Sequence, residues 1–233
     1  MLPLPLKPSA EAVERYATLV SEIGAQMIEE WRRDPDGVQP WRLVKPRHLE
    51  RIWREYTRTG IVTNEKLLDA VVERLVENTA RLEINTILAD HTDRDPAVVV
   101  AEFGDLTGAE LESFSAWAIH LTKEDRLASR DDFVAMRISD TYKLLVAPAL
   151  LAIGAKSAEE KAVYANMLLD VAHQRSDLAG WFVEGGTWAL SEISGYGSKT
   201  PAVARSPSIS EFVREHREET RSNIEAARLL RRP

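Results

Sequence analysis

Cysteine is absent from this chain of 233 residues. Its absence excludes disulfides, thiolate metal sites and cysteine nucleophiles together. A chain without cysteine is also compatible with a reducing compartment, where disulfides are rare. We therefore expect a cytoplasmic protein.

Long apolar runs and targeting features are missing as well. The longest weakly charged run, Leu144 to Ala155, is shorter than the roughly 20 residues that a membrane-spanning helix needs. It is interrupted by Pro148, and we interpret it as a buried helix. Residues 1–8 alternate proline with other residues and lack the basic and continuous apolar regions of a signal peptide. The sequence therefore predicts an extended N-terminal arm over residues 1–8.

Positive charge is scarce overall but unevenly placed. The net charge is −7, which argues against general affinity for nucleic acid because phosphate binding needs a positive field. Residues 31–60 nevertheless carry eight Arg or Lys against four Asp or Glu, whereas residues 61–130 carry seven against fourteen. One part of the chain is basic and the next is acidic.

Signals for β-hairpins are lacking, and apolar residues instead recur every three or four positions, which is the period of a helical face. The sequence predicts an all-α fold, an irregular bundle of about seven helices with a Gly/Trp-rich loop before the last one. A short Val-rich helical turn is also expected between Asp95-Pro96 and Gly104. The seven helices are expected over 9–33 and 46–59, from Asn64, from Thr107, from Asp131 or Asp132, over 157–178, and over 208–228.

Three capping boxes support these helix starts, because each has a Ser or Thr followed three residues later by Glu. They are Thr107 with Glu110, Ser157 with Glu160, and Ser208 with Glu211. We divide the chain into the arm of residues 1–8, a bundle over 9–206, and a C-terminal helix within 207–233. This last helix is expected to pack on the bundle or on a partner.

The stretch from Gly180 to Pro207 breaks the helical pattern. It contains five of the eleven glycines and two of the six tryptophans, Trp181 and Trp188. Glycine beside aromatic rings is typical of ligand lids and partner-binding loops. The alternative is a surface connection whose tryptophans fold back onto the bundle, and the sequence does not decide between the two.

A line of arginines marks the second helix. Helical spacings of four, three and four place them on one face, where guanidinium groups can bind carboxylates or phosphates. Glu50 and Glu55 could neutralise part of this charge within the helix, and the acidic half of the chain could take up the rest. The arginines are Arg47, Arg51, Arg54 and Arg58, and we refer to them as the arginine strip.

A polar line also runs along the helix that begins at Ser157. Asp170 and His173 resemble the Glu-x-x-His pair of di-iron bundles, but the chain lacks a second such pair. A metal site would have to borrow Glu83, which lies on an apolar face and has to be paired, protonated or ligating. We expect instead that this line is the solvated side of its helix. Its residues, the polar seam, are Asn166, Asp170, His173 and Asp177.

No catalytic constellation stands out in the sequence. A Gly-x-Ser-x-Gly elbow is absent, and the basic helix lacks the Asn or Gln usual among base-reading contacts. We therefore expect a non-catalytic helical protein, an assembly factor or subunit that binds a protein partner through the arginine strip, Trp181 and Trp188. The alternative is a metal-dependent helical-bundle oxidoreductase with Glu83, Asp170, His173 and Asp177 as ligands. The sequence decides neither the presence of a cofactor nor the oligomeric state.

Overall fold

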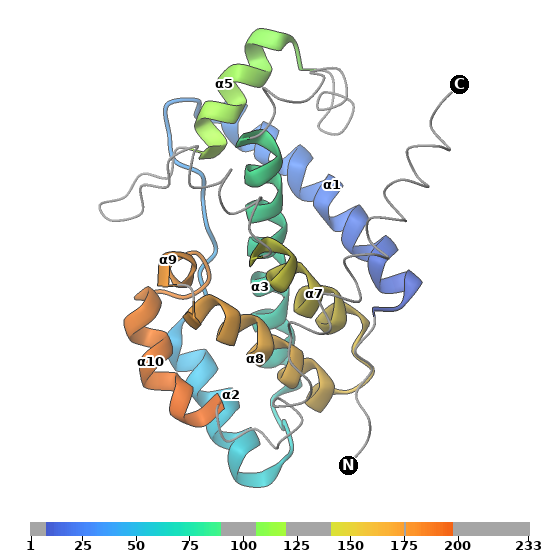
Figure 1. Ribbon diagram of the computed structural model, residues 1–233, viewed down its shortest axis with the longest axis vertical. Coiled ribbons are helices and arrows are strands. Elements are labelled where there is room, and N and C mark those ends of the chain that lie inside the picture. The colour runs from blue at the N-terminus through green and yellow to red at the C-terminus, as the bar shows by residue number, and fades with distance from the viewer. Residues whose placement is uncertain (1–7, 90–105, 120–140, 175, 198–233) are drawn as a thin grey trace.

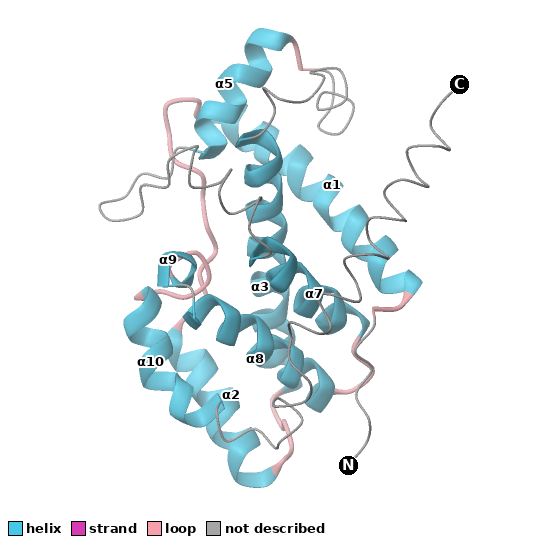
Figure 2. Cartoon of the chain, viewed as in Figure 1, coloured by secondary structure: helices cyan, strands magenta, loops and turns pink. Residues whose placement is uncertain are grey.

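Helices make up most of the chain that the computed structural model describes, namely residues 8–89, 106–119, 141–174 and 176–197. Seven of these helices have at least 12 residues, and α9 is a single turn (Figure 1). The described residues contain no strand, which confirms the all-α prediction (Figure 2). The helices are α1 (Ala10–Arg33), α2 (Pro46–Thr59), α3 (Glu65–Ala89), α5 (Gly108–Ile119), α7 (Thr141–Gly154), α8 (Ala158–Gln174), α9 (Ser176–Ala179) and α10 (Gly186–Gly197).

The helix ends follow the signals in the sequence. The Ser9 side chain accepts a hydrogen bond from the Ala12 N–H at 3.1 Å and caps α1. The capping box before α5 is complete, because the Thr107 N–H donates to Glu110 at 2.7 Å and the Glu110 N–H donates to the Thr107 hydroxyl at 3.3 Å. The hydrogen bond from the Thr107 N–H to the Glu110 carboxylate, followed by the interaction with the Thr107 side chain, lowers the pKa of that carboxyl. The α2 helix ends at its C-cap residue Gly60, whose φ of 70° lies in the left-handed region.

The centre of the bundle is α3, which packs against α1, α2, α5, α7 and α8 (Figure 1). Most of its described apolar side chains are buried, among them Leu68, Leu75 and Leu82. The α3 helix also places polar side chains in the interior of the bundle, which the sequence did not predict. Its wholly or nearly buried polar residues are Glu77, Asn78, Thr79, Arg81, Asn85 and Thr86.

Arg81 is the most costly of these buried groups, because it carries a full charge on a side chain that is 0% exposed. Its guanidinium donates to both carboxylate oxygens of Glu30 on α1, at 2.9 and 3.0 Å. Glu77, one turn earlier on α3, lies 3.6 Å from the Arg81 Nε. A buried charge is tolerated only with such close partners, so this bidentate pair fixes α1 against α3.

Asn78 connects the same part of α3 to a distant segment. Its amide donates to the Trp181 carbonyl at 3.1 Å and to the Arg42 carbonyl at 3.2 Å. Next to these residues an isolated parallel bridge joins Val44 to Val183. The Val44 N–H donates to the Phe182 carbonyl at 2.8 Å, so the segment before α2 is bonded to the segment before α10.

Two predictions about the last described helices are wrong. The helix expected over 157–178 ends at Gln174, and α9 forms a separate turn. Part of the predicted Gly/Trp-rich loop is helical, since α10 covers Gly186–Gly197. Burial of Leu190 and Ile193 in the interior outweighs the low helix propensity of the glycines there. Gly185 and Gly186, with φ of 83° and 56°, make the turn before α10.

Several expected elements lie outside the described residues. They include the arm up to residue 7, the turn after Asp95-Pro96, the helix start at Asp131 or Asp132, and the C-terminal helix within 207–233. In the part that is described, no helix has the length and the apolar character needed to cross a membrane.

Replacing Arg81 by alanine tests the structural role of the buried ion pair. The variant leaves the Glu30 and Glu77 carboxylates without their buried cation, and we expect the free energy of unfolding to fall by about 3–5 kcal/mol. Arg33→Ala, at an exposed position of α1, should cost less than about 1 kcal/mol. Urea denaturation measures both values, and equal losses would contradict a structural role for Arg81.

Candidate functional site

The arginine strip lies on the solvent side of α2. All four of its arginines are exposed. The opposite side of the helix faces the interior, since Leu49, Ile52, Trp53 and Tyr56 are buried. This amphipathic arrangement holds the cations on a packed helix instead of on a loop.

Much of the charge of the strip is not neutralised within the helix. Glu50 pairs with Arg54, as the sequence suggested. Glu55 does not take up Arg58, because its carboxylate accepts hydrogen bonds from the Thr63 hydroxyl and the Thr63 N–H instead. In the described part of the chain, Arg47, Arg51 and Arg58 take part in no ion pair. Three guanidinium groups are thus available on one face.

The positive charges around the start of α2 affect the pKa of His48. The pKa of His48 is lowered, first by burial and then by the charges of Arg47, Arg74 and Lys45, against an opposing effect of Glu184. The first turn of α2 contains no acidic residue, so the positive end of the helix dipole adds to these cations. An anionic group is therefore favoured near this end of α2.

The α10 helix lies along α2 (Figure 1). Val44 and Val183 form a parallel bridge, and each helix begins a few residues after its own member of that bridge. The two helices therefore start side by side and run in the same direction. A side chain at the start of α10 consequently lies at about the same level as the start of the arginine strip.

The two tryptophans of the Gly/Trp-rich stretch have different roles. Trp181 is 7% exposed and packs edge-to-face on Trp41, with ring centroids 4.9 Å apart. Trp188, near the start of α10, is 69% exposed. The sequence offered a contact surface and a core plug as alternatives for both rings. The structure buries Trp181 and leaves only Trp188 at the surface.

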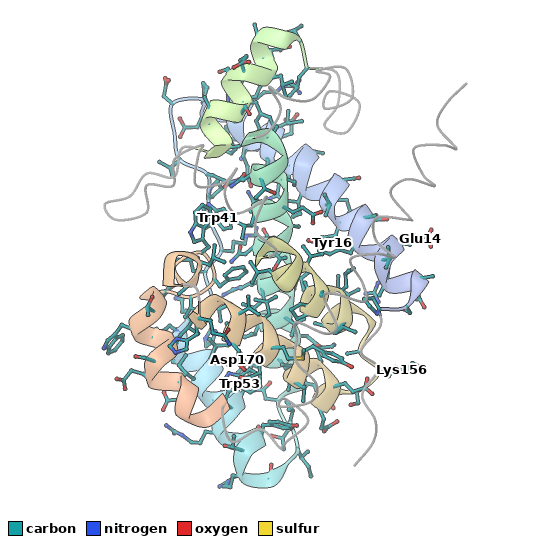
Figure 3. All side chains as sticks on the ribbon, in the orientation of Figure 1. Glu14, Tyr16, Trp41, Trp53, Lys156 and Asp170 are labelled. Atoms are coloured by element: carbon teal, nitrogen blue, oxygen red, sulfur yellow. The ribbon has the colours of Figure 1, made fainter. Side chains whose placement is uncertain are left out.

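Three residues of the polar seam face the interior, so the solvated-face interpretation is wrong for them. Asn166, Asp170 and His173 line a cavity of about 20 Å³ between α8, α2 and α10, and Trp53 lies on its α2 side (Figure 3). The Asn166 amide donates to Asp170 at 3.2 Å. Burial raises the pKa of the Asp170 carboxyl, and the charge of His173 opposes this effect. The cavity has room for about one water molecule.

Glu83 is directed toward a different helix from the seam. Its carboxylate accepts a hydrogen bond at 2.7 Å from the hydroxyl of Tyr16 on α1, whereas Asp170 faces α2 and α10 (Figure 3). The side chain of Asp177 is outside the described residues. Among the described side chains no group of three or more His, Asp or Glu is placed to hold a metal ion. Glu83, Asp170 and His173 are thus not brought together as a ligand set.

Comparisons with known proteins supply no function for this chain. No protein-family model, curated protein or solved structure matches it. Its function is therefore inferred from the exposed charges, the burial and the contacts of its own residues.

The two tryptophans form a matched pair for mutagenesis. Trp181→Ala should lower the free energy of unfolding by roughly 3–5 kcal/mol, because it empties a packed site beside Trp41. Trp188→Ala should change it by less than about 0.5 kcal/mol, because the ring is mostly solvated. Denaturant midpoints measure both effects. A large loss in the Trp188 variant would show that its ring has a structural role.

Asp170 should make unfolding depend on pH. Its pKa in the folded chain lies above the ordinary 3.8, so the protonated carboxyl favours folding. That stabilisation is complete below 3.8 and is lost as pH rises through the higher folded value. Asp170→Asn stays neutral, so we expect its stability relative to wild type to increase across this window. Urea unfolding at pH 3.5 to 7 tests the trend, and a constant difference would contradict it.

Proposed function

We propose that this protein is a non-catalytic helical interaction protein, an assembly factor or subunit that binds an acidic surface of another protein. The arginine strip and Trp188 form the binding surface. The observation that carries the proposal is the exposure of four aligned arginines, of which Arg47, Arg51 and Arg58 lack an ion pair within the described residues.

The chemistry of the surface suits carboxylates. A guanidinium group presents its donors in a planar fork that matches the two oxygens of a carboxylate. Trp188 adds a large apolar ring on the neighbouring helix, and tryptophan with arginine is the typical composition of energetically dominant interface residues. Both helices are held by packing and by the bridge between Val44 and Val183. Little conformational entropy would therefore be lost in organising the backbone of the site.

An acidic protein fits this surface better than nucleic acid does. The chain carries a net charge of −7, so a polyanion that contacts more than the strip would meet repulsion. A protein partner can limit its acidic groups to the width of one helix and offer apolar contact to Trp188. Electrostatic attraction of this kind mainly raises the association rate and sets the orientation of the partners.

Charge reversal at the two unpaired positions Arg51 and Arg58 tests the proposal. The double variant Arg51→Glu and Arg58→Glu should weaken binding to fluorescein-labelled poly-L-glutamate at least about tenfold, a loss of about 1.4 kcal/mol. Its unfolding free energy should change by no more than about 1 kcal/mol, because the two side chains are exposed. Fluorescence anisotropy and urea denaturation measure the two effects.

The matched control reverses two exposed cations on other elements, with Arg33→Glu at the end of α1 and Lys156→Glu before α8. It changes the net charge by the same amount but should retain most of the binding. Equal weakening by both double variants would show a general effect of charge and would count against the strip. Tighter binding of a single-stranded oligonucleotide than of polyglutamate at equal salt would favour a nucleic-acid partner.

A further inference from the structure

A second surface lies away from α2, in an open groove of about 890 Å³ between α1 and α3. Ala152 and Ile153 of α7 and Lys161 of α8 line its edge. Apolar side chains from α1 and α3 form part of its lining and are buried or partly buried, which gives the groove an apolar floor. These floor residues are Leu19, Ile23, Val72 and Val76.

The groove is acidic. Six Asp or Glu and three Lys or Arg line it. The three cations already have partners within the groove: Lys161 pairs with Asp69 at 2.5 Å, Arg15 donates to the Ile153 carbonyl at 3.3 Å, and Arg42 lies 3.8 Å from Glu77. Four acids have no ion pair in the described part of the chain, namely Glu11, Glu14, Glu22 and Glu73. Their uncompensated charge favours a cationic occupant.

A buried carboxylate in the same groove points the same way. Glu77 is 7% exposed, and its Oε1 has no hydrogen-bond partner. The nearest cation to that oxygen is the Arg81 Nε at 3.6 Å, which is too long for a good hydrogen bond. Glu77 therefore adds to the negative charge of the groove, which Arg81 and Arg42 balance in part.

The length of the groove suits a helix. Its lining residues on α1 extend from Glu11 to Gln26. At 1.5 Å per residue this span is about 22 Å, the length of a helix of about 15 residues. An occupying helix would need basic side chains toward the acids and an apolar side chain toward the floor.

We propose that the groove binds the C-terminal segment of this same chain, residues 208–232, as a helix. The capping box at Ser208 predicts a helix start, and helical spacing places several arginines with Ile224 on one face. The segment carries six Arg against five Glu, and the positive charge gathers at its end, where residues 220–232 have four Arg against one Glu. The residues of this face are Arg217, Arg221, Ile224, Arg228 and Arg232, and their span of about 22 Å equals that of the groove.

The chain is long enough to make this contact. The last described helix ends at Gly197, so residues 198–216 connect it to the arginine face. Of these, the ten residues 198–207 can extend up to about 33 Å, and the nine helical residues 208–216 add about 13 Å. Together they span about the diameter of a domain of this size. An occupant on the same chain also has a high effective concentration at the groove. The proposal involves none of the residues of the arginine strip and does not rest on the proposed function.

The lack of native cysteine allows a clean cross-linking test in the full chain. One variant carries Thr18→Cys, an exposed groove position, with Ala227→Cys in the C-terminal segment. The control carries Ser191→Cys, exposed on α10, with the same Ala227→Cys. In a glutathione redox buffer, the intrachain disulfide should form with at least tenfold higher effective concentration in the Thr18 variant. An unbound tail would favour Ser191, because that residue is much closer in sequence to position 227.

Charge reversal makes the test specific. Glu14→Arg with Glu22→Arg, both at exposed positions, should remove the tenfold preference, and adding Arg221→Glu with Arg228→Glu should restore it. Circular dichroism and denaturant midpoints check that each variant is folded, and Glu14→Gln with Glu22→Gln replaces the reversal if it is not. Equal cross-linking at Thr18 and Ser191, or a preference that survives the reversal, overturns the proposal. A disulfide-linked dimer would also overturn it, by assigning the groove to a second copy of the chain.

Discussion

The ion pair between Arg81 and Glu30 is the interaction on which the described fold depends most. An uncompensated guanidinium in a protein interior is prohibitively costly, so α3 can occupy the centre of the bundle only if α1 supplies a carboxylate in the correct position. The bidentate geometry then fixes both the distance and the rotation of α1 relative to α3. The acidic groove between these helices is shaped by the same constraint.

The same part of α3 also organises the segments that lead into α2 and α10. Asn78, one turn before Arg81, is bonded to the Trp181 carbonyl. Trp181 packs on Trp41, and the bridge between Val44 and Val183 follows in the same region. This chain of contacts places α10 beside α2, and with it Trp188 on the helix next to the arginines. The surface that we propose for binding is therefore positioned from the interior.

Much of the fold could be predicted because local signals and tertiary packing agree. The 3.6-residue periodicity and the capping boxes at Thr107 and Ser157 mark helix starts that the structure confirms. The exposed arginine strip follows from the same periodicity. The inward orientation of the polar seam could not be predicted in this way. A line of polar residues has the same spacing whether it faces solvent or a small cavity between helices. The pairing of Arg81 with Glu30 could not be predicted from the sequence either, because it is a contact between residues far apart in the chain.

The hydrogen bond between Asn78 and Trp181 joins residues that are 103 positions apart, and the bridge between Val44 and Val183 spans an even longer interval. Such contacts form late in folding, because the entropic cost of closing a long loop precedes the stabilisation that the contacts provide. The pairing of α2 with α10 consequently has to wait until most of the chain has been synthesised. A partner that requires both the arginines and Trp188 would recognise only molecules that have completed folding. Under the proposed function, the surface would mark a fully folded chain, and incomplete chains would be excluded from assembly.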